Sequence, residues 1–271
     1  MPELPEVESI ARSLRRKIVG LRIAGIDCLW PKLLRGNPEE LAALAGQTVV
    51  SVGRRGKHLL LECGDRVLVF HLKMTGRFLW SRPGKPRGRH VRLVVRFDGP
   101  SRELQFEDVR KFGFVRSVAA VELAACPELR PLGPEPFGIP ADAFAARLRM
   151  RRGRIKSVLL DQAFVAGIGN IYADEMLFEA GIHPLMTASR LSRTRADRLW
   201  TAMRDVLGRA VAAGGSTIRD YRNADGEIGS FQDDHHVYGK GGQACPRCGS
   251  PVRRAVMGGR SSHYCARCQR R

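Results

Sequence analysis

The sequence lacks a long hydrophobic run and a secretion signal. Its apolar stretches fall well short of the roughly 18 residues that a membrane-spanning helix needs. Polar and basic residues interrupt the N-terminus too often for the apolar core of a signal peptide. These absences exclude a membrane protein and favour a cytoplasmic one. No segment has a composition typical of disorder, and 271 residues suffice for two domains with separate cores.

Acidic residues are in the minority. The chain has 27 Asp and Glu against 46 Lys and Arg, which leaves a net charge of +19. The basic residues are spread along the whole chain and are not confined to one tail. A chain with this much positive charge binds a polyanion, and nucleic acid is the polyanion we expect.

Cysteine is also sparse over most of the chain. Cys28, Cys63 and Cys126 are scattered, as buried small hydrophobic residues are, and do not suggest a disulfide framework. The other cysteines lie close together near the C-terminus. For these four cysteines the alternative to a metal site is two disulfides, which are unusual in a cytoplasmic protein.

These C-terminal cysteines form two Cys-x-x-Cys pairs separated by 16 residues: Cys245, Cys248, Cys265 and Cys268. This spacing is typical of a four-thiolate zinc ribbon. Four thiolates fill a tetrahedral zinc ion and leave no position for water, so we predict one structural Zn²⁺. The hairpin between the pairs carries Arg253, Arg254 and Arg260.

The first eight residues place reactive groups at the N-terminus, which is poorly ordered in most chains. Pro2 is small enough for Met1 to be removed, which would leave a secondary amine at the terminus. A terminal amine titrates near pH 8, about two units below lysine, so a fraction is nucleophilic at neutral pH. Pro5 suits the first turn of a helix and Gly20 its end. The alternative interpretation is that this motif is only a well-capped helix start.

An apolar stripe at helical spacing predicts that this first helix is buried: Val7, Ile10, Ala11, Leu14 and Ile18. Short runs rich in Val, Leu and Phe follow, at residues 48–52, 58–62, 66–72, 91–97 and 112–118. Runs at this spacing predict an antiparallel sandwich or barrel. A Pro-rich stretch, residues 127–140, indicates a domain boundary.

Beyond this stretch the apolar period becomes helical. We expect helices at residues 141–150, 155–162, 170–180 and 193–213, the last capped by Ser192. The glycines of the connector at 163–170 would let backbone amides approach a phosphate. Residues 214–232 read as a long functional loop. His235 and His236 are expected to point to opposite sides of a strand and to be exposed.

Together these patterns predict an α+β protein. It has an N-terminal helix and antiparallel β-sandwich domain at residues 1–127, followed by a linker at 128–140. A helical domain covers 141–235, and a zinc-finger hairpin covers 236–271.

Short stretches along the whole chain match one family in order and spacing. They are residues 2–8, 55–57, 71–76, 108–113, 161–175, 237–239 and 259–265. With these stretches the chain resembles the bacterial formamidopyrimidine-DNA glycosylases. The resemblance implies that the helical domain at 141–235 is a helix-two-turns-helix DNA-binding domain. The resemblance implies an enzyme that removes oxidised purines, 8-oxoguanine and formamidopyrimidines, from duplex DNA and then cleaves the abasic strand by β,δ-elimination.

The resemblance also implies catalytic roles. Pro2 would attack C1′ and form a Schiff base, while Glu3 would protonate the sugar ring oxygen. Glu6 would support both. Lys57 would contact the phosphate beside the lesion, and Arg260 would grip a flanking phosphate and assist elimination.

Further residues match family positions that contact DNA: His90, Arg110, Arg151 and Asn170. Met74, Arg110 and Phe112 match the residues that fill the hole left by the everted base. Met74 and Phe112 could instead be core residues of strands, but the neighbouring glycines favour exposed turns. The glycine-rich segment at 226–231 would close over the everted base.

Two other functions remain compatible with the sequence. One is an endonuclease VIII-like glycosylase for oxidised pyrimidines, which shares the terminal proline, the lysine and the helix-two-turns-helix domain. The other is a catalytically silent DNA-binding relative, against which Pro2, Glu3 and Lys57 argue. For the enzyme we expect a monomer that acts on double-stranded DNA in the bacterial cytoplasm, associated with the nucleoid.

Overall fold

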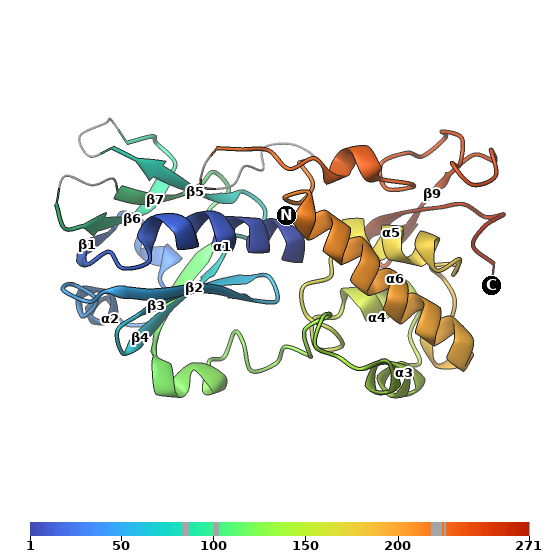
Figure 1. Ribbon diagram of the computed structural model, residues 1–271, viewed down its shortest axis with the longest axis horizontal. Helices are drawn as coiled ribbons and strands as arrows, with labels where there is room; N and C mark the ends of the chain where they lie inside the picture. Colours follow the sequence, from blue (N-terminus) through green and yellow to red (C-terminus); the bar gives the residue numbers. More distant parts are fainter. Residues whose placement is uncertain (83–86, 100–102, 218–223, 225, 271) are drawn as a thin grey trace. The chain divides into compact units, whose positions relative to one another are not determined.

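A computed structural model describes residues 1–82, 87–99, 103–217, 224 and 226–270 of the chain (Figure 1). These residues form two compact units. The first unit comprises Met1–Arg130 with Ala213–Ser230, and the second comprises Pro131–Ala212 with Phe231–Arg271. No described helix combines the length and the apolar character needed to cross a membrane.

The first unit is built on two four-stranded antiparallel sheets. One has the strand order β1-β6-β7-β5 and the other β2-β3-β4-β8. The strands are β1 Ile23–Cys28, β2 Val49–Arg55, β3 His58–Cys63, β4 Arg66–His71, β5 Gly76–Ser81, β6 Val91–Phe97, β7 Glu103–Asp108 and β8 Phe114–Ala119. The predicted α+β class and the antiparallel sandwich are confirmed.

Aromatic side chains from both sheets meet in the core of the first unit. Phe70 of β4 lies 5.1 Å from Phe78 of β5 and 5.7 Å from Phe106 of β7, measured between ring centroids. All three rings are fully buried. Because side chains alternate between the faces of a strand, these positions fix which face of each sheet points inward.

Helix α1, Leu4–Ile18, packs along β2 in the opposite direction (Figure 1). All five residues of the predicted apolar stripe are fully buried. At the end of the helix, Gly20 N donates to Val49 O at 2.9 Å, and one turn earlier Arg15 Nη2 donates to Val52 O at 2.6 Å. These contacts anchor the helix whose first turn follows Pro2.

The sequence patterns did not predict strand β7, because acidic and amide residues interrupt the apolar alternation that is typical of a strand. Every residue of β7 is buried. Arginines neutralise its carboxylates: Arg87 pairs with Glu103 at 3.1 Å, and Arg77 pairs with Glu107 at 2.6 Å. A strand with ionised side chains on one face is stable here because each charge is paired.

The described residues of the second unit form four α-helices and a two-stranded hairpin. The elements are α3 Ala141–Arg149, α4 Ile155–Leu160, α5 Asn170–Glu179, α6 Arg193–Ala212, β9 Arg253–Met257 and β10 Arg260–Tyr264. The four helices lie where the apolar period predicted them, and Ser192 Oγ caps α6 by accepting from Arg195 N at 3.3 Å. Short helices complete the chain: α2 Pro38–Ala42 and the 3₁₀ turns Pro31–Leu33, Ala120–Ala125, Ala188–Arg190 and Phe231–Asp234.

The segment Ala213–Ser230, which the sequence places inside the helical domain, belongs to the first unit. Ser216 N donates to Glu6 of α1, and Ala224 packs in the core of the first unit. Residues 218–223 and 225, which lie within the predicted loop, are outside the described residues. The chain therefore returns to its first unit before it completes its second.

Candidate active site and DNA-binding surfaces

The N-terminal turn holds two buried carboxylates. Pro2 precedes the helix and is partly exposed, whereas Glu3 and Glu6 are 3% and 2% exposed. Glu6 Oε2 accepts a hydrogen bond from Glu3 N at 2.7 Å. Because Glu3 and Glu6 form a capping box, the residue after Pro2 has one fixed backbone position.

Glu6 also reaches the segment that follows α6. Its Oε1 accepts a hydrogen bond from Ser216 N at 2.7 Å. Gly215 has a φ of +86°, and a Cβ there would lie 2.7 Å from Glu6 Oε1. Only glycine fits both the backbone and the space at this position. The carboxylate thus joins the N-terminal turn to the segment at 214–216.

Lys57 lies in the turn between β2 and β3 and is 6% exposed. The antiparallel course of α1 and β2 continues in a salt bridge between Glu8 Oε2 and Arg54 Nε at 3.1 Å. Burial raises the pKa of Glu8, but the hydrogen bonds and charges of Arg54 and Arg12 outweigh it and lower the pKa. Because β2 runs antiparallel to α1, the turn after β2, which contains Lys57, lies toward the first turn of the helix.

Two exposed turns present large apolar side chains. Met74, between β4 and β5, is 42% exposed, and Phe112, between β7 and β8, is 54% exposed. They are therefore turn residues and not core residues. Arg110 lies over Phe112, with Cζ 4.7 Å from the ring centroid. His90 precedes β6, where its ring accepts from Arg89 Nε at 3.0 Å.

In the second unit a glutamine holds the connector before α5. Gln162 Nε2 donates to Ile168 O at 2.9 Å, and its Oε1 accepts from Gly167 N at 3.0 Å. Asn170, the first residue of α5, donates to Ser261 O at 2.9 Å. The N-terminus of α5 is thereby attached to the hairpin strand that carries Arg260.

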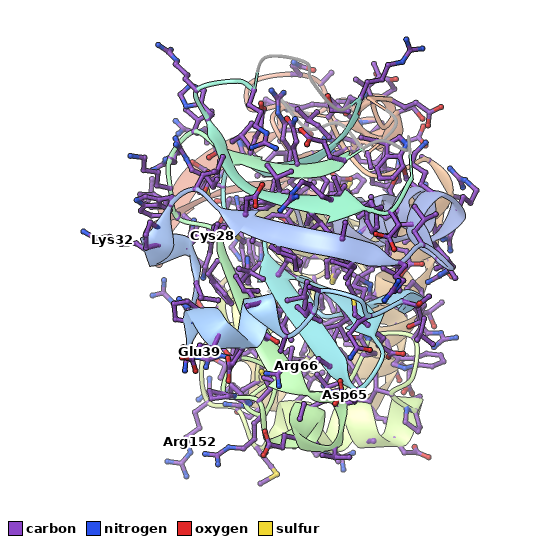
Figure 2. The ribbon with its side chains drawn as sticks, turned by 90° about the vertical axis from the view of Figure 1, so that its left-hand side faces the viewer. Cys28, Lys32, Glu39, Asp65, Arg66 and Arg152 are labelled. Atoms are coloured by element: carbon purple, nitrogen blue, oxygen red, sulfur yellow. The ribbon has the colours of Figure 1, made fainter. Side chains whose placement is uncertain are left out.

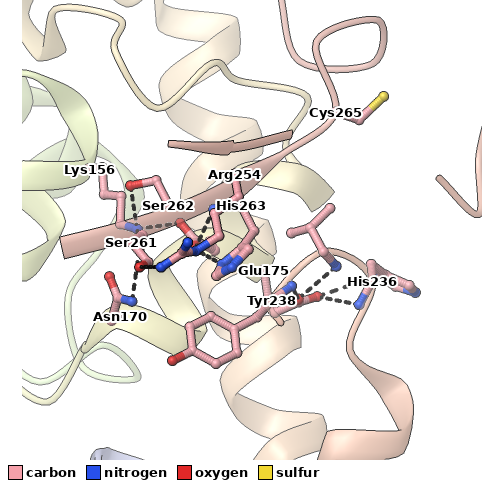
Figure 3. A network of polar contacts seen from close by, with 12 residues as sticks. Lys156, Asn170, Glu175, His236, Tyr238, Arg254, Ser261, Ser262, His263 and Cys265 are labelled. Atoms are coloured by element: carbon pink, nitrogen blue, oxygen red, sulfur yellow. Dashed lines mark hydrogen bonds and ion pairs between the residues drawn. The ribbon is translucent and has the colours of Figure 1, made fainter. Parts of the chain in front are cut away.

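A buried ion pair makes a second attachment of the hairpin to the helices (Figure 3). Lys156 of α4 pairs with Asp174 of α5 at 2.6 Å and donates to Ser262 Oγ at 2.8 Å. Asp174 Oδ2 also accepts from His263 N at 2.9 Å. Both charges are satisfied by partners, which is the condition for burying them.

The neighbouring Glu175 binds the segment that leads into the zinc hairpin. Its carboxylate, 1% exposed, accepts backbone hydrogen bonds from His236, Val237 and Tyr238 at 2.8, 3.0 and 2.7 Å (Figure 3). Three successive N–H groups that converge on one carboxylate form a rigid anion clamp.

His235 corrects one expectation from the sequence. It is 4% exposed and makes edge-to-face contacts with Phe231 and Tyr238, whose ring centroids are each 5.7 Å away. The two histidines follow a 3₁₀ turn and not a strand, so their side chains do not alternate as predicted. His236 is partly exposed, 3.8 Å from Glu179.

The four C-terminal cysteines meet at one point. Their sulfur atoms all lie within 4.8 Å of one another, with Cys248 and Cys265 3.5 Å apart and Cys245 and Cys268 3.8 Å apart. Tetrahedral bonds of about 2.3 Å to Zn²⁺ separate sulfur ligands by about 3.8 Å. A disulfide requires about 2.05 Å. The cluster therefore fits one structural zinc ion, as predicted.

The tip of the hairpin between the cysteine pairs carries Arg260. Gly258 and Gly259 turn the chain with φ of +58° and +73°, and exposed Arg260 follows them. The structure thus presents Arg260 at the edge of a rigid hairpin and connects it, through Ser261, to Asn170. Arg151, after α3, instead pairs with Asp161 at 3.3 Å.

Sequence reasoning missed Asp174 and Glu175. A signal was present, because α5 is apolar on all sides: Ile171, Tyr172, Ala173, Met176, Leu177 and Phe178 are all buried. A helix of this kind is buried all round, so acidic residues within it must also be buried and need partners.

Comparisons with known proteins agree with this geometry. The chain matches the formamidopyrimidine-DNA glycosylase N-terminal domain over residues 1–115, the H2TH domain of the same proteins over 132–222, and a zinc finger found in FPG and IleRS over 242–271. Formamidopyrimidine-DNA glycosylases of Bacillus licheniformis and Streptococcus pneumoniae are 45% and 44% identical, with full coverage of both chains.

Solved structures show the same similarity. A complex of a Lactococcus lactis FPG mutant with Fapy-dG-containing DNA has a TM-score of 0.94 at 36% identity, and covers 100% of both chains. A complex of the L. lactis protein with abasic-site DNA has a TM-score of 0.92 at 36% identity and covers 99% of this chain. The chain belongs to the formamidopyrimidine-DNA glycosylase family.

Proposed function

We propose that this protein excises oxidised purines from duplex DNA and cleaves the resulting abasic strand with the amine of Pro2. The observation that carries the proposal is the first turn of α1. There a partly exposed proline directly precedes a buried carboxylate whose backbone is held by Glu6 at 2.7 Å. A nucleophile and an acid that are adjacent and fixed suit attack on a sugar carbon.

Base removal begins once Met1 has been cleaved. The lone pair of the Pro2 nitrogen attacks C1′, the glycosidic bond breaks, and its electron pair leaves with the base. Glu3 protonates the ring oxygen, so the sugar opens and the nitrogen, after losing its proton, becomes a cationic iminium at C1′. A secondary amine can form this cation but no neutral imine.

Strand cleavage follows from the acidity of the iminium. Loss of a proton at C2′ expels the 3′ phosphate, and a second elimination expels the 5′ phosphate. Lys57, in the turn that follows β2, would neutralise the phosphate next to the lesion. In the second unit Arg260 and Asn170 would bind the flanking backbone, where a guanidinium stays charged and donates two parallel hydrogen bonds.

Base eversion requires a replacement for the extruded nucleotide. Met74 and Phe112 are exposed apolar side chains on turns, and Arg110 stacks on Phe112 with donors available for the unpaired opposite base. His90 and Arg151 would contact the DNA. The segment at 226–231 would cover the everted purine, and Glu6 would hold the separate segment at 214–216 to the N-terminal turn.

The proposed assembly is a monomer acting on double-stranded DNA with oxidised bases, in the bacterial cytoplasm and at the nucleoid. The first unit would do the chemistry, and the helical and zinc-hairpin segments of the second would bind the duplex. The net charge of +19 suits a partner with phosphate along its full length. Binding should therefore weaken steeply as the salt concentration rises.

Borohydride trapping tests the proposal. Incubation with a duplex containing 8-oxoguanine should give a covalent adduct, which mass spectrometry should map to Pro2. The same chain prepared with Met1 retained should give none, because the nitrogen is then an amide. Duplexes with oxidised pyrimidines, and with each base opposite the lesion, define the substrate. Failure to trap an adduct on any lesion would leave only a DNA-binding function.

A further inference from the structure

The two turns that carry Met74 and Phe112 share an unusual backbone feature. Among the residues that the structure describes, Lys73 and Lys111 are the two non-glycine residues with positive φ, at 51° and 59°. Each directly precedes one of the exposed apolar side chains. A left-handed backbone at a non-glycine residue is strained and persists only where the surroundings enforce it.

One buried carboxylate enforces both turns. Asp108, at the end of β7, is 0% exposed. From the first turn, Thr75 Oγ1 donates to Asp108 Oδ1. From the second, Arg110 N donates to Oδ1 at 3.2 Å and Gly113 N donates to Oδ2 at 2.7 Å. Arg110 N also donates to Thr75 Oγ1 at 3.1 Å, which closes the network.

The carboxylate itself is fixed on both sides. Asp108 pairs with Gly76 in the register of β5 and β7, and its N–H donates to His90 O at 3.0 Å. Arg92 Nε donates to Asp108 O at 3.0 Å. A side chain at Gly113 would lie 3.1 Å from Asp108 Oδ2, so the turn closes tightly on the carboxylate. Asp108 thus has one position relative to both turns.

Asp108 places an acidic group beneath a surface that is proposed to bind DNA phosphates. This position is unfavourable for binding DNA unless the carboxylate has a structural role. Asp108 is an acidic group between exposed Arg110 and the turn of Lys73, on a protein of net charge +19. It does not reach the surface, and its oxygens are occupied by donors from the two turns. A charge in this place weakens attraction to DNA but makes stronger hydrogen bonds than a neutral group would.

We propose that Asp108 is a positioning residue that locks the Met74 turn and the Phe112 turn into a single wedge. The inference rests on the proposed function of Met74, Arg110 and Phe112 in filling the vacated stack. Because both turns share one carboxylate, the side chains enter the duplex together. Without the carboxylate, Lys73 and Lys111 relax and the two tips move independently.

The substitution Asp108→Asn tests this proposal, since it keeps the shape and removes the charge and one acceptor. The single-turnover rate of 8-oxoguanine excision from duplex DNA should fall about tenfold to a hundredfold. Cleavage of a preformed abasic strand, which has no base to extract from the stack, should stay within about threefold of wild type. Thr75→Val should shift the ratio of the two rates in the same direction, and Thr75→Ser should restore it.

Asp65→Asn is the matched control. Asp65 is exposed in the turn between β3 and β4, at the opposite end of β4 from the Met74 turn (Figure 2). The Asp65→Asn substitution should leave the rates of base excision and of abasic-strand cleavage unchanged. A second readout is the fluorescence of 2-aminopurine beside the lesion, which should rise more slowly in Asp108→Asn if the wedge enters late.

The outcomes separate the inference from the proposed function. Equal loss of both rates in Asp108→Asn, with a lower melting temperature, would show a general structural role and overturn the inference. Unchanged excision would also overturn it. The proposed function is judged on the wild-type protein alone, by its borohydride adduct and its abasic cleavage, and fails only if these are absent.

Discussion

Glu6 Oε1 accepts a hydrogen bond from Ser216 N at 2.7 Å, although 210 residues separate the two in sequence. The other oxygen of the same carboxylate accepts from Glu3 N, also at 2.7 Å. One side chain therefore connects the residue beside Pro2 with the segment at 214–216. A displacement of residues 214–216 must either break a charge-assisted hydrogen bond or move the first turn of α1.

The first prediction concerns this connection. Glu6→Gln retains one acceptor oxygen and places an N–H group against either Glu3 N or Ser216 N. A lost hydrogen bond to a charged group costs about 1.5–3 kcal/mol, so excision should slow about tenfold to a hundredfold. Single-turnover kinetics on 8-oxoguanine duplex measure this. Glu8→Gln, which alters the salt bridge to Arg54 on the same helix, provides a comparison. Equal rates for wild type and Glu6→Gln would contradict the prediction.

The second prediction concerns the zinc cluster. Cys248→Ser removes one of four thiolates, so the metal site should lose zinc and the hairpin that presents Arg260 should lose order. DNA affinity should fall about tenfold to a hundredfold, as expected for the loss of a charge-assisted phosphate contact.

Zinc content by atomic absorption and DNA binding by fluorescence anisotropy measure the two effects. Cys28→Ser is the matched control. Cys28 lies on β1, far from the cluster in sequence (Figure 2), and a hydroxyl can keep the hydrogen bond to Trp30 O. It should retain both zinc and affinity. Loss of zinc without any loss of affinity would show that the hairpin does not bind DNA.

Local chemistry made part of the structure predictable from the sequence. The apolar stripe of α1 and the spacing of the four cysteines each depend on residues close together in the chain, and both are as predicted. Ser192 also caps its helix as expected. Periodicity and ligand spacing are local properties, so a sequence displays them directly.

Contacts between distant residues were not predictable in this way. Strand β7 was missed because the partners of its carboxylates, Arg77 and Arg87, lie on other segments. The return of residues 213–230 to the first unit depends on Glu6 and Ser216, which no local pattern connects. The matching stretch at 108–113 was recognised, but the role of Asp108 emerged only from the donors around it.

The third prediction concerns the clamp at Glu175. Glu175→Gln leaves one acceptor oxygen for three backbone N–H groups, so at least one donor is buried without a partner. This should cost about 1–3 kcal/mol of the free energy of unfolding. It should also speed the release of zinc to a colorimetric chelator, because residues 236–238 lead into the cysteine cluster.

Glu179→Gln is the matched control for the clamp. Glu179 lies one turn further along α5 and forms a partly exposed salt bridge with Arg247 at 2.9 Å. A pair of this kind contributes about 0–1 kcal/mol, so unfolding and zinc release should change little. If Glu175→Gln and Glu179→Gln changed the free energy of unfolding and the rate of zinc release equally, the three hydrogen bonds of Glu175 would not stabilise the zinc hairpin more than the exposed salt bridge does.

The last prediction concerns the dependence of stability on pH. His58 and His71 are buried in the first unit with perpendicular rings 4.6 Å apart. Burial lowers the pKa of His58 to about 4. Burial, with the charge of His58 next in importance, lowers the pKa of His71 to about 2. His71 Nδ1 accepts from Lys73 N at 2.9 Å, a bond that requires the neutral ring.

Both histidines therefore destabilise the fold as the pH falls below 6.5, which is the pKa of a histidine side chain in the unfolded chain. There the unfolded state binds protons that the folded state refuses, so the free energy of unfolding decreases by about 1.4 kcal/mol per pH unit for each histidine. The loss stops for His58 near pH 4.

His58→Phe removes one of the two groups and keeps an aromatic ring beside Phe114. In urea unfolding, wild type and variant should both be nearly independent of pH between pH 7.5 and 6.5. Between pH 6.5 and about pH 5 the free energy of unfolding should fall less steeply for the variant, by about 1.4 kcal/mol per unit. Parallel curves would show that His58 is already protonated in the folded protein or titrates normally.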